Sequence, residues 1–164
     1  MARKVVLADA SPLISLARIG GLLWLRKLYK TISITGQVRD EAAGARELPG
    51  AVAIAAAVKQ GWIRVLRQEW NEPSLPLLDT GEASTLRAAV GLGPGTLVLL
   101  DDLPARREAQ RRGIAMIGTA GIIVEARQAG LTPAVKPVFV RLAEEGFHLG
   151  DDLVQAILAE LGEK

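Results

Sequence analysis

Short apolar runs alternate with longer amphipathic segments along most of the chain. The short runs are rich in Val, Ile and Leu, which is typical of buried strands. The predicted strands are Val5–Ala8, Thr31–Thr35, Trp62–Leu66, Thr96–Leu100 and Ile114–Ile117. Segments with helical spacing separate them, and this alternation predicts an α/β fold with a mostly parallel sheet and helices on both faces.

Capping residues and glycines bound the predicted helices, which span about 12–18, 22–29, 37–43, 49–59, 80–90, 105–112 and 119–129. Ser11 as N-cap and Pro12 as first residue predict the start of the first helix. Thr132 and Pro133 predict a further helix in the same way. The stretch Gly150-Asp151-Asp152 predicts the start of the last helix.

Length and composition favour one soluble domain. At 164 residues, the chain has the size of a single domain, which we expect to cover residues 1–164, with a helical C-terminal extension from about residue 132. The absence of Cys excludes disulfides, thiolate nucleophiles and Cys-ligated zinc, and we expect a cytoplasmic protein without a membrane span. The net charge of +2 allows an anionic partner without requiring one.

Several carboxylates are predicted at one edge of the sheet. Asp9 follows the first strand, and Asp101 and Asp102 follow the fourth. If these strands are neighbours, the three side chains meet at the switch point of the sheet, where ligands bind in open α/β folds. Glu41 lies just past the second strand, and Glu82 starts the helix before the fourth.

Carboxylates gathered without basic partners repel one another, and a hard divalent cation removes that cost. Mg²⁺ and Mn²⁺ prefer such oxygen ligands. Each carboxylate also has a local explanation. Asp79 and Glu82 fit a capping box, Asp101 and Asp102 suit a helix start, and Glu41 suits an exposed helix face.

The residues resemble the PIN domain, in particular a group of small prokaryotic PIN-like proteins formerly described only as a domain of unknown function. The matching stretches follow one another in the family's order up to about Ala129. They are Asp9-Ala10-Ser11-Pro12, Val38-x-x-Glu41, Leu78-Asp79-Thr80-Gly81-Glu82, Leu100-Asp101-Asp102-x-x-Ala105-Arg106 and Gly118-Thr119-Ala120-Gly121.

The resemblance implies a PIN-like three-layer sandwich with a central five-stranded sheet. It also implies an acidic pocket for Mg²⁺ or Mn²⁺ and metal-dependent hydrolysis of phosphodiester bonds in single-stranded RNA. Carried onto this chain, the catalytic set is Asp9, Glu41, Glu82, Asp101 and Asp102. All of these except Glu41 are metal-ligand candidates, and the register favours Asp102 slightly over Asp101. Ser11 and Thr119 would support the site through hydrogen bonds.

The resemblance further implies a toxin endoribonuclease of a toxin–antitoxin pair, with a small antitoxin protein as partner and a homodimer as the expected oligomer. A different class of function remains open: a catalytically weak PIN-fold module that binds RNA or protein. An assay for metal-dependent cleavage separates the two.

Basic residues follow the paired aspartates. Arg106, Arg107, Arg111 and Arg112 lie on the helix that leaves Asp101 and Asp102. They are either contacts for RNA phosphates or an ordinary solvated face. The single His, His148, is predicted to be a surface residue, and Trp70 is predicted to cover the core from its loop.

Overall fold

Five parallel strands form the centre of the molecule, in the order β3-β2-β1-β4-β5. The computed structural model describes residues 5–44 and 47–164. The strands are β1 (Val5–Ala8), β2 (Ile32–Ile34), β3 (Ile63–Val65), β4 (Thr96–Leu99) and β5 (Ala115–Ile117). β1 lies between β2 and β4, so the first and fourth strands are neighbours, which is the condition for Asp9, Asp101 and Asp102 to meet at one edge.

Strand residues point alternately to two hydrophobic clusters, one on each face of the sheet. Val6 and Ala8 face the larger cluster, whereas Leu7 between them faces the smaller one. On β4, Leu99 faces the larger cluster and Val98 the smaller. A sheet buried on both faces explains why its strands read as continuous apolar runs rather than as alternating patterns.

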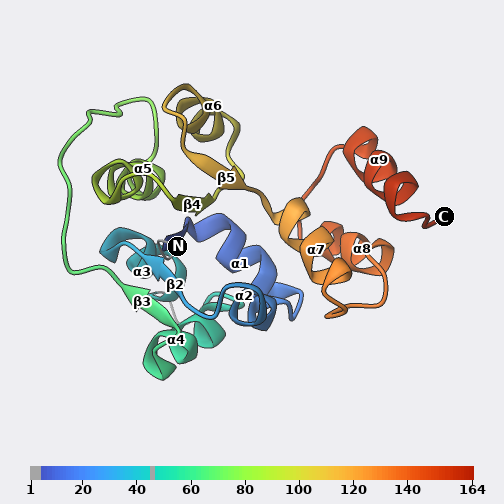
Figure 1. Cartoon of the computed structure of the whole chain (residues 1–164). Helices are drawn as coiled ribbons and strands as arrows, with labels where there is room; N and C mark the ends of the chain where they lie inside the picture. Colours follow the sequence, from blue (N-terminus) through green and yellow to red (C-terminus); the bar gives the residue numbers. More distant parts are fainter. Residues whose placement is uncertain (1–4, 45–46) are drawn as a thin grey trace.

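Helices cover both faces of the sheet. Figure 1 shows α5 and α6 on one side of the strands and α1 to α4 on the other, with α7 to α9 gathered beside β5. The bounds are α1 (Ala10–Arg18), α2 (Leu22–Tyr29), α3 (Gly36–Ala43), α4 (Ala51–Gln60), α5 (Thr80–Leu92), α6 (Leu103–Arg111), α7 (Thr119–Gln128), α8 (Lys136–Glu144) and α9 (Asp151–Leu161). The predicted α/β sandwich with a five-stranded sheet is therefore confirmed. Among the described residues, no helix is long and apolar enough to span a bilayer.

The first helix begins two residues earlier than predicted. Asp9 is its N-cap rather than Ser11, and Ala10 is the first helical residue. The Asp9 N–H still donates to Leu99 O of β4, which keeps Asp9 extended until the strand pairing ends. Pro12 then falls in the first turn, where its missing N–H costs no intrahelical hydrogen bond.

The predicted start of α8 at Thr132 and Pro133 is wrong. α8 begins at Lys136, and the carboxylate of Glu163 accepts hydrogen bonds from the N–H groups of Val135 and Lys136 at 3.0–3.1 Å. This cap comes from a residue that is distant in sequence, so a local capping pattern cannot reveal it. Thr132 instead donates to Ala134 O at 3.2 Å.

Two leucines on α2 test the position of the core. Leu25 is fully buried, whereas Leu23 on the same helix is 59% exposed. We expect Leu25→Ala to lower the free energy of unfolding by about 2–5 kcal/mol, because the change removes buried methyl groups and leaves a cavity. Leu23→Ala should change it by less than about 0.5 kcal/mol. Urea denaturation of both variants measures this difference, and equal effects would contradict the packing.

Candidate active site

Asp9 lies at the centre of the carboxyl edge of the sheet. It follows the central strand β1 and starts α1, and only 4% of its surface is exposed. Although it is the N-cap residue, its side chain makes no capping hydrogen bond. Its Oδ1 is buried without a hydrogen-bond partner among the described residues. Buried polar atoms normally have partners, so capping alone does not explain this carboxylate.

Gly81 brings further carboxylates to Asp9. A Cβ placed on Gly81 would lie 2.5 Å from Glu41 Oε2, 3.6 Å from Asp9 Oδ1 and 3.7 Å from Asp79 Oδ1. The carboxylates of Asp9, Glu41 and Asp79 therefore meet beside the backbone of Gly81, although they come from three different parts of the chain. A larger residue at position 81 would force the Glu41 carboxylate to move from its place beside Asp9, so glycine favours this close approach.

Burial and mutual repulsion raise the pKa of these groups. Burial raises the pKa of Asp9 from 3.8 to about 7, and the Ala10 N–H offsets part of the rise. The charges of Asp79, Glu41 and Asp101 add to it. Such shifts indicate an acidic group that lacks a counter-charge.

Glu82 and Glu41 respond in the same direction. The pKa of Glu82 rises from 4.5 to about 7, first through burial and then through the charges of Asp79, Asp102 and Asp9. Burial also raises the pKa of Glu41, with a further contribution from Asp79. The carboxylates on α3 and α5 and the two aspartates after β4 therefore form one group with Asp9, whose members repel one another.

Asp101 is held in place by α7. Its Oδ1 accepts the Thr119 N–H at 2.7 Å, and its Oδ2 accepts the Thr119 hydroxyl at 2.6 Å. Thr119 Oγ1 also lies 3.2 Å from Ser15 Oγ of α1. The start of α7 thus fixes the orientation of Asp101, which fits the supporting role predicted for Thr119. Sequence reasoning missed Ser15, which lies among apolar residues of α1 and carries no motif.

Asp102 and Asp79 are N-caps, as their local patterns predicted. Asp102 Oδ2 accepts the Ala105 N–H at 3.1 Å, and Asp79 Oδ1 accepts the Glu82 N–H at 2.8 Å. Both also act on other carboxylates, since Asp102 raises the pKa of Glu82 and Asp79 raises that of Asp9. Asp79 was predicted only as a cap, and the structure adds it to the acidic group. Capping and membership of the group are compatible.

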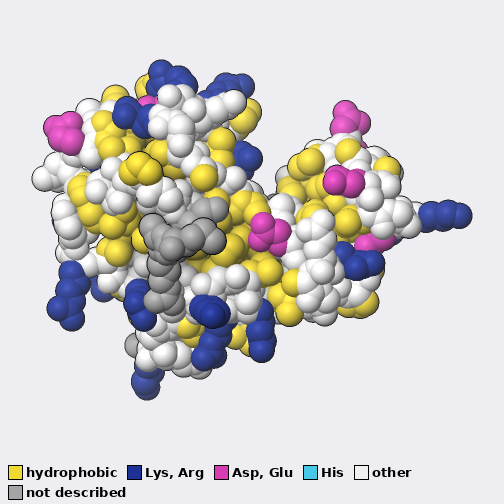
Figure 2. Space-filling model, in the orientation of Figure 1, with side chains coloured by type: hydrophobic (Ala, Val, Ile, Leu, Met, Phe, Trp, Pro, Cys, Tyr) yellow, Lys and Arg dark blue, Asp and Glu magenta, His cyan; other side chains and the backbone are white. Residues whose placement is uncertain are grey.

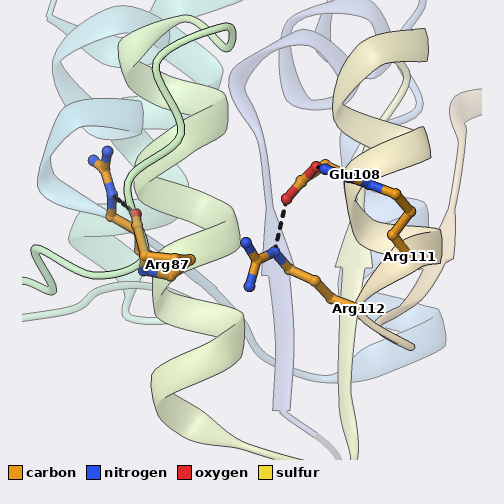
Figure 3. Close-up of polar contacts among 5 residues, drawn as sticks. Arg87, Glu108, Arg111 and Arg112 are labelled. Carbon is orange, nitrogen blue, oxygen red and sulfur yellow. Dashed lines mark hydrogen bonds and ion pairs between the residues drawn. The ribbon is translucent and has the colours of Figure 1, made fainter.

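The predicted arginines separate into two sets. Arg106 lies beside Asp101: its Nη1 donates to Leu100 O at 2.7 Å, and a Cβ on Gly118 would lie 3.0 Å from Asp101 Oδ1 and 3.1 Å from Arg106 Nη1. Arg111 and Arg112 lie at the other end of α6, where both pair with Glu108 (Figure 3). Arg107 is exposed to solvent.

Ser11 lies at the rim of a groove that also contains Asp101, Arg106 and Thr119. Its hydroxyl makes no hydrogen bond to another described residue, so the support predicted for Ser11 is supplied by Ser15 instead. His148 is exposed, as predicted, and lies on the same groove. Trp70 packs against the smaller hydrophobic cluster, as predicted for a residue that covers the core.

One family model, that of the PIN domain, matches residues 5–163. The chain belongs to the PIN-domain family. No curated protein matches it. PIN domains have a nuclease-type fold and generally use divalent metal ions, and the match covers every residue of the acidic group described above.

The acidic group suits a hard cation in its chemistry. It offers only carboxylate oxygens, one of which is buried without a partner, and such oxygens are the ligands that Mg²⁺ and Mn²⁺ prefer. Within residues 5–44 and 47–164, no three acidic or His side chains already stand in the geometry of a metal site. The PIN-domain carboxylates would therefore have to move to bind one ion together.

The raised pKa values predict how stability depends on pH without metal. Folding favours the neutral form of Asp9. Its contribution to the free energy of unfolding is therefore complete below pH 3.8 and is lost as pH rises through about 7. Each unit of pKa shift corresponds to about 1.4 kcal/mol. We therefore expect the EDTA-treated protein to be less stable at pH 8 than at pH 5.

Urea denaturation at these two pH values measures the change. Asp9→Asn should flatten the pH dependence because the amide does not titrate, whereas the exposed control Asp40→Asn should leave it unchanged. A loss of stability at pH 8 that is the same in Asp9→Asn would mean that other groups cause it.

Proposed function

We propose that this protein is a Mg²⁺- or Mn²⁺-dependent endoribonuclease that hydrolyses phosphodiester bonds in single-stranded RNA. The observation that carries the proposal is the buried Oδ1 of Asp9, which has no hydrogen-bond partner in the described part of the chain and lies amid Glu41, Asp79 and Glu82. An arrangement this unfavourable in the free protein is expected where a cation binds, because the cation removes the repulsion.

The proposed metal ligands are Asp9, Glu82, Asp101 and Asp102. Bound there, a divalent ion would lower the pKa of a coordinated water and offset charge on the phosphate. Asp101 suits a ligand because Thr119 already fixes both its oxygens, leaving their remaining lone pairs for a cation. Asp102 adds charge next to Glu82, and we retain both aspartates as ligands.

Glu41 is the proposed proton acceptor. It contacts Gly81 beside Asp9 and has a raised pKa, which brings a carboxylate closer to the range in which it exchanges protons at neutral pH. The carboxylate would take the proton from the attacking water.

Arg106 is the proposed contact for a substrate phosphate. It is the only one of the four predicted arginines on the groove beside Asp101, and its Nη1 bond to Leu100 O fixes the guanidinium there. A guanidinium held in this way binds phosphate oxygens with defined geometry.

Asparagine and glutamine substitutions test the nuclease proposal. Asp9→Asn and Glu82→Gln preserve side-chain size while each removes a charge and an anionic ligand. We expect each variant to lose cleavage of a single-stranded RNA in Mg²⁺ or Mn²⁺ by at least about a hundredfold, as seen when supporting residues of metal sites are removed. Gel assays of a labelled RNA measure the rates.

Asp40→Asn is the matched control, since Asp40 is an exposed neighbour of Glu41 on α3 and is paired with Arg39. It should cleave like the unmodified protein. Full activity in Asp9→Asn would remove Asp9 from the site. Absence of metal-dependent cleavage in the unmodified protein would instead favour a PIN-fold binding module.

The two sets of arginines predict different salt effects. Arg106→Gln should weaken binding of single-stranded RNA and reduce the slope of log K against log salt concentration by about 0.7, the value for one lost phosphate contact. Arg111→Gln and Arg112→Gln should have smaller effects, because Glu108 already pairs with both residues. Fluorescence anisotropy at several salt concentrations, in EDTA, gives these slopes, and equal slopes for all three variants would contradict the assignment.

The more specific role as the toxin of a toxin–antitoxin pair rests on resemblance within the PIN-domain family. A small reading frame directly upstream, whose product relieves growth arrest caused by this protein, would support it. Expression without growth arrest would count against it.

A further inference from the structure

A groove of about 820 Å³ leads from Asp101 and Arg106 to the C-terminal helices. Its walls come from β5 and α7 on one side and from α9 with the segment before it on the other. Figure 2 shows a notch between the body of the molecule and the lobe of the last helices, with hydrophobic side chains along it. The groove therefore begins at the proposed catalytic edge and ends outside the sheet.

The character of the lining changes along the groove. Asp101, Arg106 and Ser11 provide charged and polar groups at the catalytic end. Val124 of α7 and Leu153 and Ile157 of α9 provide apolar walls farther along. Leu153 is 48% exposed although it is apolar, so this wall is open to an occupant.

The groove is braced by contacts that do not depend on an occupant. Arg18 of α1 donates to Glu145 O at 3.4 Å and places its guanidinium 5.5 Å from the centre of the Phe147 ring. Glu163 holds the start of α8, as described above, and lies 3.6 Å from Arg127 of α7. The distance between α7 and α9 is thus set by the fold.

We propose that this groove holds a nucleobase of the RNA strand, next to the phosphate that is cleaved. The inference rests on the proposed nuclease function. An occupant that enters the catalytic end meets Arg106 beside Asp101, which suits a phosphate, and then apolar walls, which shield the faces of a base from water. The volume falls within the range of small-molecule sites and accommodates one or two nucleotides.

Two polar side chains of the groove are available to a base. The Ser11 hydroxyl is unpartnered among the described residues, and the exposed His148 also lines the groove. Glu125 also lines the groove, but its Oε2 already accepts the Tyr29 hydroxyl at 2.8 Å. The C-terminal helices therefore act in substrate selection, through contacts with a base rather than with the phosphate backbone.

A comparison of strands with and without bases tests this inference. A fluorescein-labelled single-stranded oligoadenylate and an abasic ribose-phosphate strand of the same length are bound to the full chain in EDTA, so that no cleavage occurs. We expect the strand with bases to bind the unmodified protein about tenfold more tightly, the effect of one or two buried bases.

Leu153→Lys, which places a hydrated charge in the apolar wall, should reduce this preference for bases to less than about twofold. Leu153→Ala, which removes part of one wall, should reduce it partly. Ala156→Lys is the matched control, since Ala156 is exposed on α9 and does not line the groove. It should retain the full preference, and circular dichroism checks that all variants are folded.

Equal preference for bases in Leu153→Lys and the unmodified protein would overturn the inference, and would leave the groove to another occupant such as a protein segment. Metal-dependent cleavage by the unmodified protein decides the nuclease proposal separately. A protein that cleaves RNA but whose base preference is insensitive to Leu153→Lys keeps the proposed function and loses the groove assignment. If the base preference depends on Leu153 but the unmodified protein does not cleave RNA, the groove assignment stands and the proposed nuclease function fails.

Discussion

Repulsion among carboxylates that the fold forces together is the constraint on which the site depends. β1 and β4 are parallel neighbours at the centre of the sheet, so Asp9 and Asp101 leave it at the same edge. α3 and α5 then bring Glu41 and Asp79 against Gly81, beside Asp9. Strand pairing and the buried faces of these helices stabilise the arrangement, and they hold the carboxylates close in spite of their mutual repulsion.

Hydrogen bonds from neighbouring residues fix the orientation of one carboxylate in the acidic group. Thr119 binds both oxygens of Asp101, and Ser15 lies against the Thr119 hydroxyl, so two helices and a strand end fix one carboxylate. Gly81 and Gly118 leave room for Glu41 and Arg106, whose ends would have to shift if these positions carried a side chain. Among the described carboxylates, only Asp9 has a fully buried oxygen without a hydrogen-bond partner, and such an oxygen suits a cation ligand.

The sequence predicted most of the fold because its signals are local. Each strand is a short apolar run, and Asp79, Asp102 and Gly61 mark the ends of helices, as the structure confirms. The predicted starts of two helices were wrong because a contact with a residue distant in sequence determines where each helix begins. Strand pairing with Leu99 makes Asp9, not Ser11, the cap of α1, and Glu163 sets the start of α8.

The candidate site was predicted as a set of residues but not as a geometry. The convergence of Asp9 with Asp101 and Asp102 follows from the strand order β3-β2-β1-β4-β5, which the alternating pattern allows but does not determine. The roles of Ser15, Gly81 and Glu108 depend on which helix faces lie opposite one another, and no local pattern carries that information. The position of Glu108 also explains why Arg111 and Arg112 are paired with a carboxylate, whereas Arg106 donates to Leu100 O beside Asp101. All three arginines occur in one basic stretch.

Proton release on metal binding tests the central claim most directly. Asp9 and Glu82 have pKa values of about 7 in the free protein, so a cation that binds them must displace protons near neutral pH. Titration calorimetry of Mn²⁺ into the metal-free protein at pH 6.5, in buffers with different ionisation enthalpies, counts those protons. We predict binding with release of a substantial fraction of a proton, decreasing toward pH 8.5 and reduced in Asp9→Asn. Absence of Mn²⁺ binding, or binding with the same proton count in Asp9→Asn, would contradict the account.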